Sequence, residues 1–364
     1  ALTDLGYENP TVIQEKAVPQ VIASTQDLKA FAQTGTGKTA AFSLPILQQI
    51  DVNSKATQAI ILSPTRELAV QIGNNIQEFS KYLKGVKTTT VYGGANIDEQ
   101  IRSLKKGSQI VVGTPGRTVD LIKRRALKLD NIQWVVLDEA DEMLNMGFKD
   151  ELDKVLEATP ETKQTLLFSA TFPEQVKALT QELLNNPIEI QVQSSDTSTL
   201  VQRVFTVNKG QKTALLAFLI KQHQWRQALI FVNAKNSCEH LATKLSKRGI
   251  IAEVFHGDKG QGARSRVLEE FKAGEIDVLI ATDIAARGLD IEKLPVVINF
   301  DLPRSPADYM HRIGRSGRAG EVGLALSLID YEDYHHFKII EKKNKVRLER
   351  EQVEGFEVDE ELNE

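Results

Sequence analysis

Short apolar runs, rich in β-branched residues, alternate along the chain with amphipathic stretches of helical length. In the first half these runs are Ala59–Leu62, Gln109–Val112, Trp134–Leu137 and Gln164–Phe168. Continuous apolar runs of this length suit strands that are buried on both faces of a parallel sheet. The pattern therefore predicts an α/β domain in which helices cover both faces of a parallel sheet.

The same alternation starts again in the second half. Its apolar runs are Ala228–Val232, Ala252–Phe255, Asp277–Ile280, Val296–Asn299 and Gly323–Leu328. Between the two halves, the polar segment 193–200 has no apolar periodicity, which is typical of a linker. We therefore expect similar α/β domains at residues 1–192 and 201–340, joined by this linker and followed by a charged extension at 341–364.

The charge of that extension changes sign along its length. Glu341 to Arg350 include five basic residues, whereas the last fourteen residues include seven acidic ones and no basic one. A helix end followed by a solvated tail accounts for this pattern. We expect the tail to remain in solvent.

Composition narrows the class of protein. The 364 residues, 41% of them hydrophobic, suffice for two ordinary cores, and the net charge of −4 means that a polyanion must be held by a local basic surface. The single cysteine, Cys238, excludes a disulfide framework and a multi-cysteine zinc site, so we expect a reducing compartment, the cytoplasm. No apolar run reaches the roughly 18–20 residues of a membrane helix, and no secretory signal pattern is present.

The segment AQTGTGKT can bind phosphate. It follows the apolar pair Ala30–Phe31, precedes a stretch that can begin a helix, and consists of Ala32, Gln33, Thr34, Gly35, Thr36, Gly37, Lys38 and Thr39. Backbone N–H groups of such a loop point at an anion, Lys38 can reach the β- and γ-phosphates, and the Thr39 hydroxyl can bind Mg²⁺. Ala32 stands where the general pattern has glycine, and a chance Gly-Lys-Thr turn is the alternative.

A second acidic motif supports the first. The apolar run 134–137 ends in Asp138-Glu139-Ala140-Asp141. Asp138 can hold Mg²⁺ through water, while Glu139 can orient or deprotonate the attacking water. An acidic helix N-cap is the alternative for this motif alone. Together the two motifs predict hydrolysis of a nucleoside triphosphate.

The acidic motif reads DEAD, and the chain resembles the DEAD-box ATP-dependent RNA helicases over nearly its whole length. The matching motifs, in order, are GYENPTVIQ (6–14), PTRELA (64–69), Gly93-Gly94, TPGR (114–117), SAT (169–171), FVN (231–233), HGDKGQGAR (256–264), ATDIAARGLD (281–290) and HRIGRSGRAG (311–320). The resemblance implies two tandem RecA-like domains, one ATP between them, and local unwinding or remodelling of RNA duplexes and RNA–protein complexes. Singly, each motif could be an ordinary turn or helix start, and Arg312, Arg315 and Arg318 could form a solvated basic helix face.

The resemblance assigns roles around ATP. Beyond the loop 32–39, it implies nucleotide contacts from Tyr7, Gln14, Gly288, Asp290, Arg315 and Arg318. It makes Lys38, Glu139, Arg315 and Arg318 the catalytic residues, and such an arginine can contribute roughly 10³ to 10⁵ in rate by neutralising transition-state charge. It implies coupling of ATP and RNA through Asp141, Ser169, Thr171 and His311.

The resemblance also implies an RNA partner that is held by its backbone. The implied contacts are Pro64, Thr65, Arg66, Gly93, Gly94, Thr114, Pro115, Gly116, Arg117, Asn233, Gln261, Arg264, Thr282 and Arg287. Contacts to phosphates and sugars read no bases, and contacts to the 2′-hydroxyl distinguish RNA from DNA. We expect a monomer with no membrane contact and with sequence-independent RNA binding.

Two other functions use the same motifs. An RNA clamp would use ATP only to stay closed, although the intact Glu139 argues against it, and a DNA-directed helicase would respond equally to single-stranded DNA. The region after Tyr331, which ends in LEREQVEGFEVDE, resembles the bacterial RhlE-like subgroup. For five conspicuous residues we expect core packing rather than chemistry: Met143, Met146, Phe148, Trp225 and Cys238.

Overall fold

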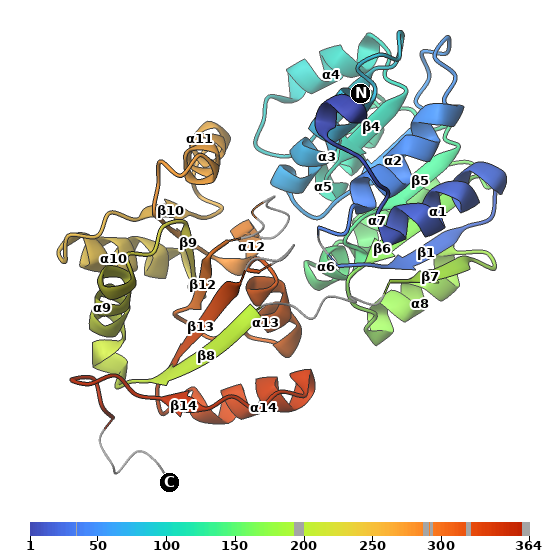
Figure 1. Cartoon of the computed structure of the whole chain (residues 1–364). Coiled ribbons are helices and arrows are strands. Elements are labelled where there is room, and N and C mark those ends of the chain that lie inside the picture. The colour runs from blue at the N-terminus through green and yellow to red at the C-terminus, as the bar shows by residue number, and fades with distance from the viewer. Residues whose placement is uncertain (34, 193–199, 287–290, 292–293, 318–321, 359–364) are drawn as a thin grey trace. The chain divides into compact units, whose positions relative to one another are not determined.

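The chain divides into two compact units, Ala1–Ser195 and Asp196–Glu364, each of which contains a seven-stranded sheet (Figure 1). The structure, a computed structural model, describes residues 1–33, 35–192, 200–286, 291, 294–317 and 322–358. The predicted site residues that lie outside the described residues are Thr34, Arg287, Gly288, Asp290 and Arg318.

The first domain alternates strands and helices. Its strands are β1 (Leu28–Phe31), β2 (Ala59–Leu62), β3 (Thr88–Val91), β4 (Ile110–Gly113), β5 (Trp134–Leu137), β6 (Gln164–Ser169) and β7 (Ile188–Gln191). Its helices are η1 (Thr3–Leu5), α1 (Val12–Ala23), α2 (Lys38–Gln49), α3 (Arg66–Phe79), α4 (Ile97–Lys105), α5 (Pro115–Lys123), α6 (Ala140–Asn145), α7 (Lys149–Glu157) and α8 (Glu174–Leu183). The strand order is β3-β4-β2-β5-β6-β1-β7, with parallel pairing throughout.

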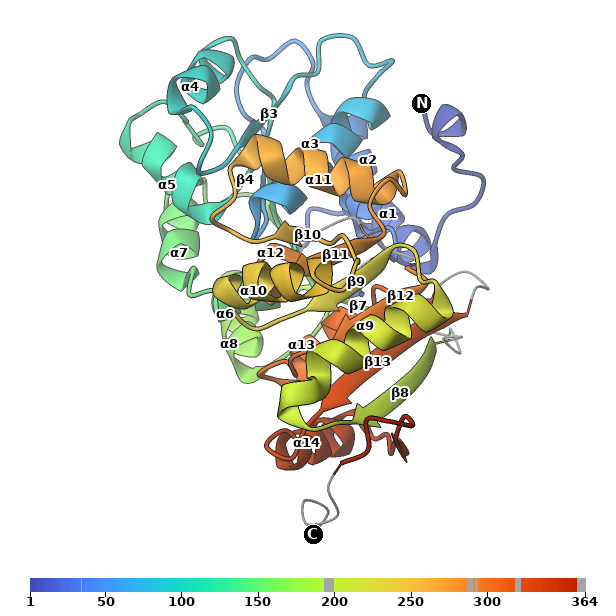
Figure 2. The ribbon, with the colours of Figure 1, turned by 90° about the vertical axis from the view of Figure 1, so that its left-hand side faces the viewer.

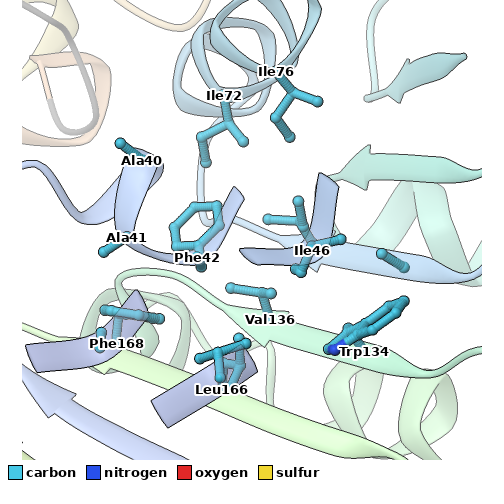
Figure 3. Close-up of a cluster of buried hydrophobic side chains, with 14 of the residues drawn as sticks. Ala40, Ala41, Phe42, Ile46, Ile72, Ile76, Trp134, Val136, Leu166 and Phe168 are labelled. Carbon is cyan, nitrogen blue, oxygen red and sulfur yellow. The ribbon is translucent and has the colours of Figure 1, made fainter. Parts of the chain in front are cut away.

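Both faces of the first sheet are buried, because successive side chains of a strand point to opposite faces and each face carries helices. Val136 and Phe168 pack with α1, α2 and α3 on one face, where Figure 3 shows Phe42 of α2 beside them. Val135 and Leu167 pack with helices α5 to α8 on the other face. The apolar runs at β2, β4, β5 and β6 are thus the doubly buried strands that the sequence predicts.

The second domain repeats this architecture. Its strands are β8 (Leu200–Thr206), β9 (Ala228–Phe231), β10 (Glu253–Phe255), β11 (Val278–Ala281), β12 (Val296–Asn299), β13 (Gly323–Ile329) and β14 (Arg350–Glu351). Its helices are η2 (Lys209–Gln211), α9 (Lys212–His223), α10 (Lys235–Ser246), α11 (Gln261–Lys272), α12 (Asp283–Ala286), α13 (Pro306–Ile313) and α14 (Tyr334–Asn344). The parallel order is β10-β11-β9-β12-β13-β8-β14, and Figure 2 shows α9 and α10 crossing one face of the sheet. The predicted fold class is therefore confirmed in both domains.

The first part of the extension packs on the second domain, ahead of the exposed acidic residues that follow it. Residues 350–351 form β14, which pairs with the edge strand β8, and Phe356 packs against the second core. Arg203 donates to Glu351 at 2.9 and 2.5 Å, and Arg350 donates to Glu341 at 2.9 and 2.7 Å. The predicted helix end is confirmed at Asn344, and Glu354 and Glu357 are exposed, as expected of a solvated tail. The prediction was wrong for Glu351, because Arg203 neutralises its charge and β8 offers unpaired backbone groups to a further strand. Residues 359–364 lie outside the described residues.

The five residues expected to pack in cores are all at least half-buried. Met143 and Cys238 are fully buried, and burial raises the pKa of the Cys238 thiol to about 12. Phe148 and Trp225 pack against the cores of their domains, and Met146 is half-buried. None of the helices in the described part of the chain combines the length and apolar character that a bilayer-spanning segment requires.

Candidate functional site

The loops that follow the strands of the first domain meet at one edge of the sheet, because all its strands run in the same direction. Strand order sorts the sequence motifs along this edge. From one side to the other they are Gly93-Gly94 after β3, Thr114–Arg117 after β4, Pro64–Arg66 after β2, Asp138–Asp141 after β5, Ser169–Thr171 after β6 and residues 32–39 after β1. The motifs predicted for RNA thus occupy one half of the edge and the phosphate loop the other, with the DEAD residues between them.

The phosphate loop turns sharply into α2. Ala32 is buried and donates its N–H to Ser169 O at 3.1 Å, which ties the loop to β6. Gly35 and Gly37 have φ values of +74° and +89°, a conformation that glycine adopts without strain. Lys38 is the first residue of α2 and Thr39 the second, so both lie at a helix N-terminus, where backbone N–H groups attract anions.

The N-terminal segment supports this loop. Gln14 accepts a hydrogen bond from Thr11 N at 3.0 Å and donates one to Gly37 O at 3.2 Å, while the Thr11 hydroxyl donates to Thr36 O at 2.7 Å. A Cβ on Gly37 would clash with the Gln14 amide nitrogen. Tyr7 is 41% exposed and packs edge-on against a ring of α3. The adenine contacts of Gln14 and Tyr7 stay predictions.

Lys38 and Asp138 form a buried ion pair. The Lys38 Nζ lies 3.5 Å from Asp138 Oδ1, and both side chains are more than nine-tenths buried. Burial opposes the lysine charge, but the carboxylates of Asp138, Glu139 and Asp141 outweigh it, so the pKa of Lys38 is raised. Among the described residues the Lys38 Nζ makes no hydrogen bond. A charged, buried ammonium therefore retains donors for an anionic ligand.

Glu139 has an unusual backbone. Its φ and ψ of 53° and 51° lie in the left-handed region, which costs a residue with a Cβ roughly 1–2 kcal/mol. This turn connects the end of β5 to the start of α6 at Ala140. Its N–H bonds to Asp138 Oδ1 at 3.0 Å. Strain of this kind is held in place by the surrounding structure and is frequent at active sites.

Asp141 links the DEAD residues to the SAT motif. Its Oδ2 accepts hydrogen bonds from the backbone N–H of Thr171 at 2.9 Å and from its hydroxyl at 2.6 Å. The Ser169 hydroxyl donates to Thr171 O at 2.6 Å. Three of the residues predicted to couple ATP and RNA therefore form one hydrogen-bonded unit between β5 and β6.

The glycine turn after β3 is enclosed by an arginine. The guanidinium of Arg66 lies against it, since a Cβ added to Gly94 would clash with Arg66 Nη1. Gly94 itself has a φ of +84°. Thr65 caps α3 by accepting a hydrogen bond from Leu68 N at 3.3 Å. The motifs Pro64–Arg66 and Gly93-Gly94, well separated in sequence, are thus in contact.

Arg117 turns towards the same loop. It donates to Gln100 Oε1 at 2.9 Å and, from both terminal nitrogens, to Ala95 O at 3.3 Å. Thr114 and Pro115, at the start of α5, are buried, whereas Gly116 is exposed. Gln100 was not predicted from the sequence, because a single amide in an amphipathic helix carries no recognisable signal.

The second domain is organised around Arg312. Only 1% exposed, Arg312 donates to both carboxylate oxygens of Asp283 at 2.6 Å, to Asp301 O at 2.6 Å, and to the amide oxygens of Asn233 at 3.0 Å and Asn299 at 3.1 Å. A solvated basic helix face is therefore wrong for Arg312, which instead connects the FVN, ATDIAARGLD and HRIGRSGRAG motifs. Sequence analysis missed this role.

Other predicted residues of the second domain are less open than a surface RNA site suggests. Arg315 and Thr282 are buried, so the basic-face alternative is wrong for Arg315 as well. Arg264 is also buried, with its guanidinium over the ring of Phe255 at 5.0 Å. Gln261 begins α11, and His311 lies half-buried near the end of α13.

Comparisons with known proteins match both domains. The DEAD/DEAH box helicase model matches residues 11–179, and the helicase conserved C-terminal domain model matches residues 210–320. The chain is similar to the ATP-dependent RNA helicase CshA of Listeria monocytogenes, with 45% identity over 95% of this chain and 66% of the relative. A solved structure of Saccharomyces cerevisiae Dbp5 bound to RNA and ADP BeF3 is 32% identical, with a TM-score of 0.86 over 96% of this chain and 92% of that one.

The chain belongs to the DEAD-box helicase family.

This DEAD-box chain is also similar to the ATP-dependent RNA helicase DeaD of Escherichia coli, with 42% identity over 98% of the chain but only 57% of the relative. The chain thus spans about two thirds or less of the length of these curated relatives. The RhlE-like subgroup stays a prediction. At the carboxyl edge of the first sheet, this DEAD-box chain has the phosphate loop, the left-handed turn at Glu139 and the glycine turn that contacts Arg66.

Proposed function

We propose that the chain is an ATP-dependent RNA helicase that locally unwinds or remodels RNA duplexes and RNA–protein complexes, driven by RNA-stimulated ATP hydrolysis. The observation that carries this proposal is the buried Lys38 ammonium. It lies at the N-terminus of α2, 3.5 Å from Asp138, and makes no hydrogen bond among the described residues. Because buried N–H donors without hydrogen-bond acceptors are costly, the site favours an anion that can accept from Lys38, such as the β- and γ-phosphates of ATP.

The oxygen ligands beside Lys38 suit Mg²⁺. The Thr39 hydroxyl and the Asp138 carboxylate are hard ligands, and Mg²⁺ usually keeps several waters and takes substrate phosphates as further ligands. In the described part of the chain no cluster of three or more His, Cys, Asp or Glu side chains could hold a metal alone. When bound, the ion would neutralise phosphate charge during transfer.

Hydrolysis then needs a water-orienting group and added positive charge. We assign the first role to Glu139, which follows Asp138 in the left-handed turn at the start of α6, and the second to Arg315 and Arg318 of the second domain. Since ATP-binding and arginine motifs belong to different domains, turnover is proposed to need both. The Asp141–Thr171 hydrogen bonds supply a direct link between the DEAD residues and the SAT motif.

RNA is the proposed partner, bound through its backbone. The support is the placement of the glycine turn, the start of α3 and the start of α5 side by side at the β3, β4 and β2 half of the sheet edge. Backbone N–H groups there can bind phosphates without reading bases. We propose that a single copy of the chain carries out the cycle.

Steady-state ATP turnover tests the proposal. Single-stranded RNA should stimulate the wild-type chain more than single-stranded DNA does, and Glu139→Gln should lower turnover by roughly 10² or more while ATP binding persists. Glu157→Gln, an exposed glutamate at the end of α7, is the matched control and should behave as wild type. A turnover rate that RNA does not change, or that Glu139→Gln does not lower, would contradict the proposal. Equal stimulation by single-stranded DNA would indicate a DNA partner.

A further inference from the structure

Gln100 is a buried amide on a mostly exposed helix. It is the one residue of α4 that is fully buried, with 7% of its surface exposed. Its Nε2 donates to Tyr92 O at 3.1 Å, and its Oε1 accepts from Arg117 Nη1 at 2.9 Å. Arg117 in turn donates to Ala95 O. These bonds close a ring around residues 92–95, the turn that follows β3.

Arg66 packs on the same turn that this ring of hydrogen bonds surrounds. Arg117 holds the turn at Ala95, Gln100 holds it at Tyr92, and the guanidinium of Arg66 packs on the glycine between them. The two first-domain arginines that the sequence predicts as RNA contacts, Arg66 and Arg117, therefore have their guanidinium groups against the turn. A turn restrained at both ends keeps its backbone N–H groups aligned before a ligand arrives, which lowers the ordering cost of binding.

A packing role alone does not explain an amide here. A buried polar group destabilises a fold unless both its donor and acceptor are bonded, and an apolar side chain of the same size would avoid that cost. The amide of Gln100 bonds at both ends, and its acceptor is directed to a residue of the RNA-side motif. The network thus orients Arg117 and the turn rather than filling space.

We propose that Gln100 is a positioning residue for RNA binding, which aligns Arg117 and the turn 92–95 without touching RNA itself. The inference rests on the proposed RNA helicase function. It predicts that loss of the amide weakens RNA binding far more than it slows the chemical step, and that the weakening is transmitted through Arg117.

The test uses the full chain and the RNA concentration that gives half-maximal stimulation of ATP turnover. Gln100→Leu removes both hydrogen bonds and should raise that concentration about tenfold, while the maximal rate changes much less. Gln100→Glu keeps the acceptor for Arg117 but loses the donor to Tyr92 O, so it should recover part of the loss. Gln77→Leu, at an exposed glutamine of α3, is the control and should match wild type.

A double-mutant cycle separates positioning from general destabilisation. In an Arg117→Met background, Gln100→Leu should have little further effect on the half-saturating RNA concentration. An equal effect in both backgrounds, no recovery with Gln100→Glu, or a Gln100→Leu chain that behaves like Gln77→Leu would overturn the inference. If the wild-type chain shows no RNA stimulation, the proposed function itself fails, which is a distinct result.

Discussion

Removal of the Arg312 guanidinium should unfold the second domain at a markedly lower temperature. Arg312→Met keeps an apolar side chain of similar length but leaves the Asp283 carboxylate, the Asn299 amide and the Asp301 carbonyl without this donor. Breaking a buried ion pair by removing one partner costs roughly 3–5 kcal/mol. Since the Asp283 side chain is 20% exposed and water can reach part of it, we expect about 3–4 kcal/mol.

Scanning calorimetry of the full chain measures this loss. For a domain of roughly 150–250 residues, each kcal/mol shifts Tm by about 2–4 °C, so the second domain's transition should fall by roughly 6–16 °C while that of the first domain stays in place. Arg312→Lys should recover less than half, because an ammonium cannot reproduce the planar bidentate contact with Asp283. Arg304→Met, at an exposed arginine just before α13, is the control. If the free energy of unfolding of the second domain in Arg312→Met were within about 1 kcal/mol of that in the control, the role of Arg312 as the organising residue would be refuted.

Two further predictions concern the extension and the glycine turn. Hydrogen bonds from Arg203 hold the pKa of Glu351 below its usual value. This pair therefore stabilises the fold above the unfolded pKa of about 4.3 and loses its effect as pH falls through the lower folded pKa. Urea unfolding should show that wild type is more stable than Glu351→Gln near neutral pH and that this difference disappears in acid, whereas a difference independent of pH would contradict the pairing. Gly94→Ala should cost about 1–2 kcal/mol in the stability of the first domain, because its φ is +84°, and should also raise the half-saturating RNA concentration severalfold by displacing Arg66. Gly147→Ala, with a φ of +82° and open space around its Cβ position, should show the backbone cost alone.

The sequence was sufficient for the elements whose physics is local. Short, continuous apolar runs such as Trp134–Leu137 predict strands that are buried on both faces of a sheet. A motif that follows such a strand is then placed at the carboxyl edge of the parallel sheet. β3, which reads Thr-Thr-Thr-Val at the end of its sheet, escaped prediction because this edge strand has no continuous apolar run. β14 escaped because it consists of two charged residues and depends on pairing with β8.

In the predicted site, too, features that follow from local motifs could be predicted, whereas features that depend on long-range contacts could not. The Lys38–Asp138 pair could be expected from two motifs that serve one substrate. The burial of Arg312 could not, since its three-residue spacing from Arg315 imitates an exposed helix face, and its partners Asp283 and Asn233 lie 29 and 79 residues away. Gln100 was equally hidden. Long-range hydrogen bonds that join separate motifs are thus the part of the site that sequence patterns do not encode locally.

The rate of ATP turnover by the wild-type chain, with and without saturating single-stranded RNA, tests the central claim most directly. If the phosphate loop, the DEAD residues and the glycine turn act as one RNA-driven ATPase, RNA should increase the rate, and the increase should vanish in Glu139→Gln. The same rate in the presence and absence of RNA would contradict the account.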